Sequence, residues 1–156
     1  MKNSFKKMEI DIIKMLPEHA AQAAKIEAEE FSKPWSRQGF IDALGLAHTL
    51  FYAALIRERL VGYCGIYLAA DEGEITNVAV SFMCRRQGIG QALLRHTLRQ
   101  AYERGARQVF LEVRSSNEPA ILLYQKLGFR MEGRRKNFYQ SPLEDALVMK
   151  YEYADK

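Results

Sequence analysis

The sequence predicts a mixed α/β fold in which a mostly antiparallel central sheet carries helices on both faces. The apolar residues change period along the chain in the order strand, helices, three strands, helix, strand, helix and two strands, so the segments do not alternate as in a doubly wound fold. The 156 residues are enough for one hydrophobic core and too few for two. We find no internal repeat and no Gly/Ser linker, and therefore expect a single domain over residues 1–156.

One strand and two helices are predicted at the start of the chain. Residues 9–14 alternate apolar and polar side chains, which is typical of a strand. An Ala-rich segment follows Pro17, a residue that the first turn of a helix tolerates. Ser36 can cap a second, shorter helix that carries Phe40 and Leu44 on one side.

Three β-rich runs come next, over residues 50–56, 60–68 and 74–82. The first two runs are joined by residues 57–59, a connection short enough for a hairpin. Residues 71–73 have the composition of a turn before the third run. These spacings predict an antiparallel meander.

The longest helix is predicted where the period changes from two to about 3.6. Leu94, Leu98, Ala101 and Tyr102 form an apolar stripe at helical spacing, and Gly105 stops the helix. The stripe indicates a helix packed on the sheet.

The C-terminal part is expected to hold the remaining helix and three strands. Residues 109–113 have the composition of a buried strand. Asn117 can cap a helix that Gly128 ends. Residues 129–135 and 146–153 form the last two strands, around a polar loop.

Composition excludes several classes of protein. No run of about 18 apolar residues exists to span a bilayer, and residues 1–8 are not followed by the apolar run of a signal peptide, so we expect a cytoplasmic protein without membrane contact. Cys64 and Cys84 have neither disulfide-framework nor metal-ligand spacing, which predicts reduced thiols and no metal site. The net charge of +4 comes from basic residues interleaved with acids, and no nucleic-acid motif is present. Binding of nucleic acid is therefore not expected.

The most informative segment is Arg85-Arg86-Gln87-Gly88-Ile89-Gly90-Gln91-Ala92, between a predicted strand and the longest helix. Two glycines let a backbone approach a ligand closely, and the free N–H groups and dipole of a helix start favour an anion. A pyrophosphate fits this description. The alternative is an ordinary glycine-rich turn with two arginines in solvent.

Two other nucleotide motifs match the same residues less well. A P-loop needs lysine and then Ser or Thr after its second glycine, and Gln91-Ala92 supplies neither. A dinucleotide fingerprint needs a small residue where Leu93 stands, although Glu112 lies at about the right distance to mimic its ribose-binding acid. The dinucleotide motif stays open as the weaker alternative.

The pattern Arg-x-x-Gly-x-Gly between strand and helix resembles the coenzyme A pyrophosphate loop of the GNAT acetyltransferase superfamily. Four further segments, in the expected order along nearly the whole chain, are similar to the RimI-type ribosomal-protein-alanine N-acetyltransferases of that superfamily. They are Phe31-Ser32-Lys33-Pro34-Trp35-Ser36, Asn77-Val78-Ala79-Val80, Leu111-Glu112-Val113-Arg114-Ser115-Ser116-Asn117 and Leu123-Tyr124-Gln125-Lys126-Leu127-Gly128-Phe129.

This resemblance implies the GNAT fold and direct transfer of an acetyl group from acetyl-coenzyme A to an amine in a ternary complex, without a covalent enzyme intermediate. The acceptor it implies is the N-terminal α-amine, expected to be alanine, of a ribosomal protein, with the enzyme a monomer or weak dimer. The coenzyme-binding residues that it implies are Val78, Ala79 and Val80 for the pantetheine arm, Arg85, Arg86, Gln87, Gly88, Ile89, Gly90 and Gln91 for the pyrophosphate, and Asn117 for a further contact.

The resemblance also assigns the general base to Glu112 and the general acid to Tyr124. A peptide α-amine has a pKa of about 7.7 to 8.0, so a base must remove a proton before the amine attacks, and a phenol with a pKa near about 10 can protonate the leaving thiolate. Glu112 shares one face of an otherwise apolar strand with Phe110, and an acidic side chain at such a position is unusual unless it has a function. Without the resemblance, the alternative for Glu112 is a strand carboxylate that faces solvent. The alternative for Tyr124 is a helix aromatic residue packed on its neighbours.

On the acceptor side, the resemblance points to Trp35 and Tyr139. Trp35 is expected to shape the peptide groove, although core packing is the usual role of such an aromatic residue. Tyr139, expected in the loop before the last strand, matches a tyrosine near the acceptor, and the stretch from Tyr139 to Asp145 is shorter than in the RimI-type proteins.

Two other functions remain open at this stage. One is acetylation of a lysine side chain or a small-molecule amine on the same fold. The other is a non-catalytic acyl-coenzyme A-binding module, which needs neither Glu112 nor Tyr124.

Overall fold

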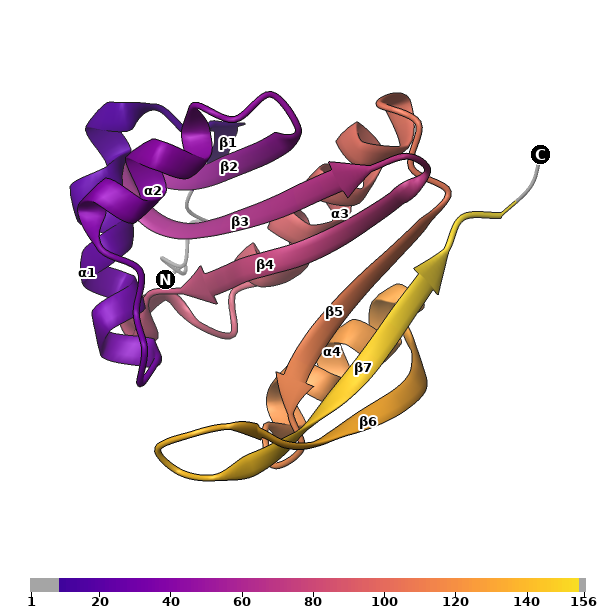
Figure 1. The fold of residues 1–156 in the computed structure, drawn as a ribbon. Helices are drawn as coiled ribbons and strands as arrows, with labels where there is room; N and C mark the ends of the chain where they lie inside the picture. Colours follow the sequence, from indigo (N-terminus) through magenta and orange to yellow (C-terminus); the bar gives the residue numbers. More distant parts are fainter. Residues whose placement is uncertain (1–8, 155–156) are drawn as a thin grey trace, which may run out of the picture.

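One seven-stranded sheet forms the centre of the molecule, with its strands in the order β1-β2-β3-β4-β5-β7-β6 (Figure 1). The computed structural model describes residues 9–154. Its strands are β1 (Asp11–Lys14), β2 (Thr49–Ile56), β3 (Arg59–Ala69), β4 (Glu72–Val80), β5 (Gln108–Arg114), β6 (Arg130–Tyr139) and β7 (Glu144–Glu152). Of the neighbouring pairs, β4 and β5 run parallel and the others antiparallel, which confirms the predicted mostly antiparallel sheet.

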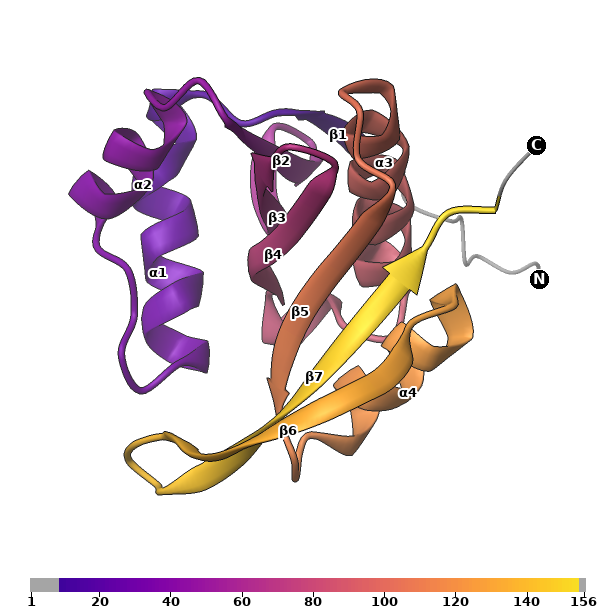
Figure 2. The same ribbon diagram turned by 45° about the vertical axis from the view of Figure 1, so that its right-hand side comes forward.

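Helices cover both faces of this sheet, as predicted. They are the 3-10 turns η1 (Pro17–His19) and η2 (Phe82–Cys84) and the α-helices α1 (Ala20–Glu30), α2 (Arg37–Leu44), α3 (Ile89–Glu103) and α4 (Glu118–Leu127). Figure 2 shows α1 and α2 on one side of the sheet and α3 and α4 on the other. Within residues 9–154, none of them is long and apolar enough to cross a membrane.

The predicted caps position three of these helix ends. The Ser36 hydroxyl accepts a hydrogen bond from the backbone N–H of Gly39 at 3.0 Å. The Asn117 side chain accepts one from Ala120 at 3.3 Å at the start of α4. Gly128 ends α4 with a φ of 113°, a conformation that favours glycine.

Each face of the sheet has its own hydrophobic core. Under α1 and α2, the buried rings of Phe40, Phe51 and Tyr63 pack together, with ring centroids 5.4 Å apart for Phe40 and Tyr63. Under α3 and α4, the core includes the fully buried Leu93 and Val109. The apolar residues at helical spacing and those at strand spacing therefore pack against each other in these two cores.

The sheet opens between its two parallel strands. The strands β4 and β5 pair only from Glu72 opposite Gln108 to Ile75 opposite Leu111, and then diverge (Figure 1). A shift of register between β3 and β4 at Gly65 bends β4 just after that point. The opening is the feature of the fold that positions the candidate site.

One predicted strand boundary and one predicted core position are wrong. Strand β6 continues to Tyr139, which pairs with Glu144, so Tyr139 ends a strand and does not lie in a loop. The side chains of β6 are almost all exposed, so no apolar alternation indicated its second half. Tyr102 is 40% exposed and not a core residue, because its ring lies against Tyr153 and under the guanidinium of Arg107.

Candidate active site

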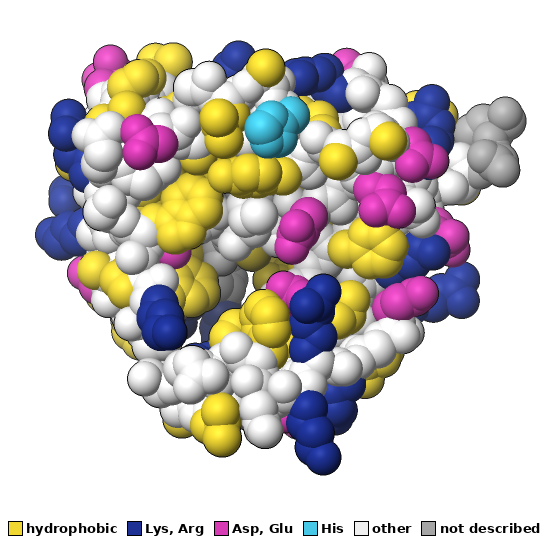
Figure 3. All heavy atoms as spheres, in the orientation of Figure 1, with side chains coloured by type: hydrophobic (Ala, Val, Ile, Leu, Met, Phe, Trp, Pro, Cys, Tyr) yellow, Lys and Arg dark blue, Asp and Glu magenta, His cyan; other side chains and the backbone are white. Residues whose placement is uncertain are grey.

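The predicted site residues gather around the opening between β4 and β5. Figure 3 shows the surface hollowed between the part of the molecule that carries α1 and α2 and the β6–β7 pair, with acidic side chains at the edge of the hollow. Beyond Ile75, the edge of β4 that faces β5 pairs with no strand in residues 9–154. Val78, Ala79 and Val80, which lie along this part of β4, are half-buried. An extended ligand can therefore add to this edge.

The start of α3 is suited to an anion. The first helical hydrogen bond runs from the N–H of Ala92 to the carbonyl of Gly88 at 3.0 Å, which leaves the N–H groups of Ile89, Gly90 and Gln91 outside the helical ladder. In the described chain, no side chain caps this helix start. These N–H groups and the helix dipole together offer a site for negative charge.

The loop before α3 has an unusual backbone. Gly88 has a φ of 79° and Arg86 has a φ of 65°, a conformation that is uncommon for a residue with a side chain. The side chains of Arg86 and Gln87 are exposed, whereas that of Ile89 is only 1% exposed. Ile89 therefore anchors the helix start in the core and can serve a ligand only through its backbone. Gln91 follows, half-buried, in the first turn of α3.

Arg85 points away from the glycines of this loop. Its guanidinium forms an ion pair with Glu30 at the end of α1 and donates to the carbonyl of Val80 at 3.3 Å. The predicted coenzyme contact of Arg85 stays a prediction. What its side chain does in the structure is join the loop to α1 and β4.

Glu112 lies on β5 just beyond the last residue that pairs with β4. Leu111 and Val113 face the core under α3, so Glu112 faces the side of α1 and α2. Its carboxylate is 2.6 Å from the guanidinium of Arg135 on β6. Burial raises the pKa of Glu112, Arg135 opposes this shift, and the nearby Glu74 adds to it. A carboxylate with a raised pKa at an opening in the sheet can act as a base.

Tyr124 lies on α4 and is 7% exposed. Its ring centroid is 5.8 Å from that of Phe129. Burial raises the pKa of Tyr124, and the neighbouring Cys64 and Tyr139 raise it further, so the phenol remains neutral and can donate a proton or a hydrogen bond. The ring is packed, as the sequence-based alternative of a packed aromatic residue requires, and Cys64 and Tyr139 are near enough to affect the pKa of its hydroxyl.

Tyr139 connects the two predicted catalytic residues. Burial raises its pKa to about 12, with Glu112 as the next cause, and Tyr139 in turn affects Tyr124. The guanidinium of Arg114 lies 4.5 Å from the centre of the Tyr139 ring. Tyr139 on β6 is therefore near enough to Glu112 on β5 and to Tyr124 on α4 for their charges to affect one another's pKa.

Trp35 is both a packing residue and a surface residue. Its ring lies 5.3 Å from Phe40 and 5.9 Å from Phe51, as the packing alternative requires. It also lines a shallow groove with Tyr67 and residues of α2, including Asp42. Its predicted role in the acceptor groove is untested, and the two roles are compatible.

Asn117 is exposed and uses its side-chain oxygen to cap α4. Only the amide N–H₂ of this side chain is left to contact a coenzyme. The predicted coenzyme contact stays a prediction.

Sequence reasoning missed a buried polar cluster around Glu27 of α1. The Glu27 side chain is 4% exposed and accepts hydrogen bonds from the Tyr63 hydroxyl, from the Trp35 backbone at 3.3 Å and from the Asn77 amide at 3.4 Å. Burial raises the pKa of Glu27, and these three hydrogen bonds oppose the shift. The signal was present, because Glu27 continues the apolar spacing of Ala20 and Ala23 along α1.

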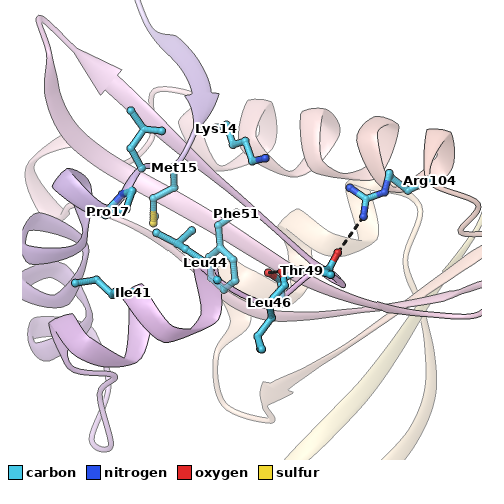
Figure 4. A pocket seen from close by; sticks show the side chains of 12 residues that line it. Lys14, Met15, Pro17, Ile41, Leu44, Leu46, Thr49, Phe51 and Arg104 are labelled. Carbon is cyan, nitrogen blue, oxygen red and sulfur yellow. Dashed lines mark hydrogen bonds between the residues drawn. The ribbon is translucent and has the colours of Figure 1, made fainter.

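A second hollow lies elsewhere, between β2 and the region around α2 (Figure 4). Met15, Leu44 and Phe51 form part of its apolar wall, and Arg104 at its edge donates to the carbonyl of Ala47 at 3.2 Å. None of the predicted site residues lines it. Among residues 9–154, no group of three His, Cys, Asp or Glu side chains is arranged to hold a metal ion.

Known proteins resemble the chain in both sequence and structure. The sequence profile described as the acetyltransferase (GNAT) family matches residues 20–129. A Bacillus subtilis (strain 168) protein, provisionally named a [ribosomal protein bS18]-alanine N-acetyltransferase, is 40% identical over 126 residues, which cover 80% of this chain and 83% of that protein.

Two solved structures share the fold. The ribosomal-protein-S18-alanine N-acetyltransferase from Escherichia coli has a TM-score of 0.87 at 29% identity and covers 95% of this chain, with 96% of its own chain covered. Arabidopsis thaliana NAA60, in a complex with acetyl-CoA, has a TM-score of 0.84 at 21% identity, with 92% of this chain and 98% of that chain covered. The second likeness concerns the fold alone.

Proposed function

Because the chain belongs to the acetyltransferase (GNAT) family, we propose that it transfers an acetyl group from acetyl-coenzyme A to the N-terminal α-amine, with alanine as first residue, of a ribosomal protein. The observation that carries the chemistry is the position of Glu112, at the opening of the sheet and paired with Arg135. The names of the Bacillus subtilis and Escherichia coli relatives support the choice of acceptor.

The coenzyme-binding residues fit acetyl-coenzyme A. The uncapped start of α3 offers the backbone N–H groups of Ile89, Gly90 and Gln91 to a pyrophosphate, and the exposed Arg86 adds positive charge beside it. The free edge of β4 offers backbone groups to the amides of a pantetheine arm. When bound, acetyl-coenzyme A supplies an activated thioester carbonyl.

Glu112 acts as the base in this proposal. Much of a peptide α-amine is protonated at neutral pH, since its pKa is about 7.7 to 8.0, and a carboxylate with a raised pKa is better matched to remove that proton. Burial provides the raised pKa of Glu112, while Arg135 keeps the group from being fully neutralised. The protein can therefore hold an ionised base at the opening of the sheet.

Tyr124 acts as the acid when the thiolate leaves. Its raised pKa keeps the proton on the hydroxyl until a strong base, such as the thiolate, is formed nearby. Cys64 is near enough to Tyr124 to affect its pKa, but burial raises the pKa of Cys64 itself to about 12, so this thiol is protonated and a poor nucleophile. This supports direct transfer to the amine over an acetylated cysteine.

The proposal is tested with a panel of peptides that differ in their first residue and carry one internal lysine, incubated with acetyl-coenzyme A and analysed by mass spectrometry. Acetylation is expected on the α-amine of the alanine peptide. Glu112→Gln should lose activity at pH 7 and regain part of it towards a pH of about 8, where the α-amine deprotonates by itself.

Acetylation of the internal lysine alone would contradict the proposed acceptor. Recovery of Glu112→Gln only near a pH of about 10 would also indicate a lysine amine. A wild-type rate and pH profile in this variant would remove Glu112 from the role of base. Circular dichroism of Glu112→Gln is compared with that of the wild-type protein at each pH, so that loss of the base and loss of the fold are not confused.

A further inference from the structure

Two buried side-chain oxygen atoms in the described part of the chain have no hydrogen-bond partner: Oδ1 of Asn77 on β4 and Oγ1 of Thr97 on α3. Such atoms are rare, because leaving a buried polar group unpaired costs free energy. Thr97 lies within the core under α3, where its neighbours are apolar or Cys64. Asn77 lies at the opening of the sheet, where a ligand can supply the missing donor.

The orientation of the Asn77 amide follows from Glu27. The amide nitrogen donates to the Glu27 carboxylate at 3.4 Å, and an amide oxygen in its place would be repelled by that carboxylate. Oδ1 is therefore turned away from Glu27. Glu27 is itself held by the Tyr63 hydroxyl and the Trp35 backbone, so the cluster has one favoured arrangement.

Within the sheet, the buried Asn77 has a paired strand on one side only. Its partner on β3 is Gly65, and the ring of Phe51 fills the space of a side chain there, since a Cβ on Gly65 would lie 2.1 Å from that ring. On the β5 side, pairing has already ended at Ile75. Asn77, with its buried and unpaired oxygen, therefore lies on the part of β4 that borders the opening.

Asn77 and Glu112 lie on the same face of the sheet, one on each side of this opening. The bond to Glu27 of α1 places the Asn77 side chain on the side of α1 and α2. Glu112 faces the same side, because its neighbours on β5 face the opposite core. Two acceptors, one of them a base, thus border the place where the acceptor amine and the thioester meet in the proposed reaction.

We propose that Asn77 Oδ1 accepts a hydrogen bond from the α-amine of the acceptor, and that Glu27 is a positioning residue that holds the Asn77 amide in the required orientation. This inference rests on the proposed function and specifies how the amine is recognised. In the reaction the C–N bond forms and the C–S bond breaks. Of the three hydrogens of the α-ammonium group, one goes to Glu112, one replaces the proton that Tyr124 gives to the leaving thiolate, and the third remains on the new amide. Asn77 binds this third hydrogen and so directs the lone pair.

The charges at the opening favour an amine over a neutral donor. Glu27, Glu74 and Glu112 are carboxylates close to it, and the Arg135 guanidinium is already paired with Glu112. An ammonium group gains from this negative charge, whereas an amide N–H of a pantetheine arm does not. The pantetheine arm is the alternative that the experiment must separate.

The test compares an alanine peptide with the same peptide carrying N-methylalanine, for the wild-type protein and Asn77→Leu. The N-methylated amine loses both of its hydrogens during transfer and has none left for Asn77. We expect kcat/KM for the alanine peptide to fall roughly ten- to hundredfold in Asn77→Leu, which is the usual effect of losing a hydrogen bond to a charged group. For the N-methylated peptide, kcat/KM should change little. Thr97→Val, which removes the other unpaired oxygen, is the matched control and should behave as wild type.

Binding of acetyl-coenzyme A to Asn77→Leu is measured by calorimetry and should be unchanged. Weaker binding of the coenzyme with an unaltered preference between the two peptides would assign Asn77 to the pantetheine arm and overturn the inference. Equal losses for both peptides would also overturn it. If Asn77→Leu does not fold, Asn77→Ala answers the same question. Failure of the wild-type protein to acetylate any peptide α-amine would instead overturn the proposed function.

Discussion

At the scale of single residues, the ionisation of Glu112 depends on a group that is distant in the sequence. Burial raises the pKa of Glu112, and the Arg135 guanidinium at 2.6 Å lowers it again. The side chain of Arg135 is 61% exposed, so solvent weakens this interaction but does not remove it. Arg135 therefore sets the lower end of the pH range in which the base is ionised.

Replacing Arg135 by methionine should shift the acid limb of the activity profile. Without the guanidinium the pKa of Glu112 rises, and because only the ionised carboxylate accepts a proton, kcat/KM falls at low pH and recovers at high pH. The measurement is the pH dependence of kcat/KM for the alanine peptide. Arg134→Met is the control, since Arg134 pairs with Asp145 at 2.9 Å, and its profile should match the wild type. An unmoved acid limb in Arg135→Met would show that Arg135 does not influence the base.

At the scale of elements, the start of α3 combines a strained loop with an uncapped helix. Arg86 and Gly88 both have positive φ values, and the first three N–H groups of the helix lie outside its ladder. By contrast, Asn117 caps α4, and Ser36 caps α2. A helix start that lacks such a cap is free to bind an anionic group.

The variant Gly90→Asp should bind acetyl-coenzyme A roughly a hundredfold more weakly, because it places a carboxylate where phosphates are expected. The site has room for a side chain, since a Cβ at Gly90 would lie 3.4 Å from Leu123, an ordinary contact. Gly90→Ala is the matched control and should keep most of the affinity. Calorimetry gives both values, and circular dichroism verifies the fold. An unchanged affinity in Gly90→Asp would move the pyrophosphate site elsewhere.

At the scale of the whole molecule, Arg114 at the end of β5 joins the two parts that border the opening. Its guanidinium donates to the carbonyl of Pro142 at 2.9 Å, to Glu144 at 3.2 Å and to the carbonyl of Gln140 at 3.1 Å. One of its nitrogens also lies 3.5 Å from the Ser32 hydroxyl, after α1. The β6–β7 turn is thereby held towards the segment between α1 and α2.

Replacing Arg114 by methionine should raise KM for the alanine peptide roughly tenfold, because the turn and Tyr139 lose their common partner. Affinity for acetyl-coenzyme A should stay the same, since the hydrogen bonds of the Arg114 guanidinium go to the β6–β7 turn and to Ser32, and not to the start of α3. Arg107→Met, at the other end of β5, removes a guanidinium with similar bonds to the carbonyls of Tyr102 and Ala106 and is the control. A parallel loss of coenzyme affinity would show that Arg114 supports the whole site and not its acceptor side.

Much of the fold was predictable from local signals. Hydrophobic period identified the meander and the long helix, and Ser36, Asn117 and Gly128 indicated helix ends by their own chemistry. The glycine-rich loop indicated an anion site, because its physical requirements lie within a few neighbouring residues. The exposed second half of β6 was not predictable, since its strand conformation comes from pairing with β7.

The sequence by itself determined the family and the fold class, and both are confirmed. The site residues that it indicated, and the role of each, stay predictions. Only the tertiary structure decided which groups face one another: Arg135 beside Glu112, Arg85 on Glu30, and Asn77 on Glu27 with an unpaired oxygen. The reason is physical. Period, caps and turns depend on residues a few positions apart, whereas pKa values and unpaired atoms depend on burial and on partners that the folded sheet brings together from distant segments.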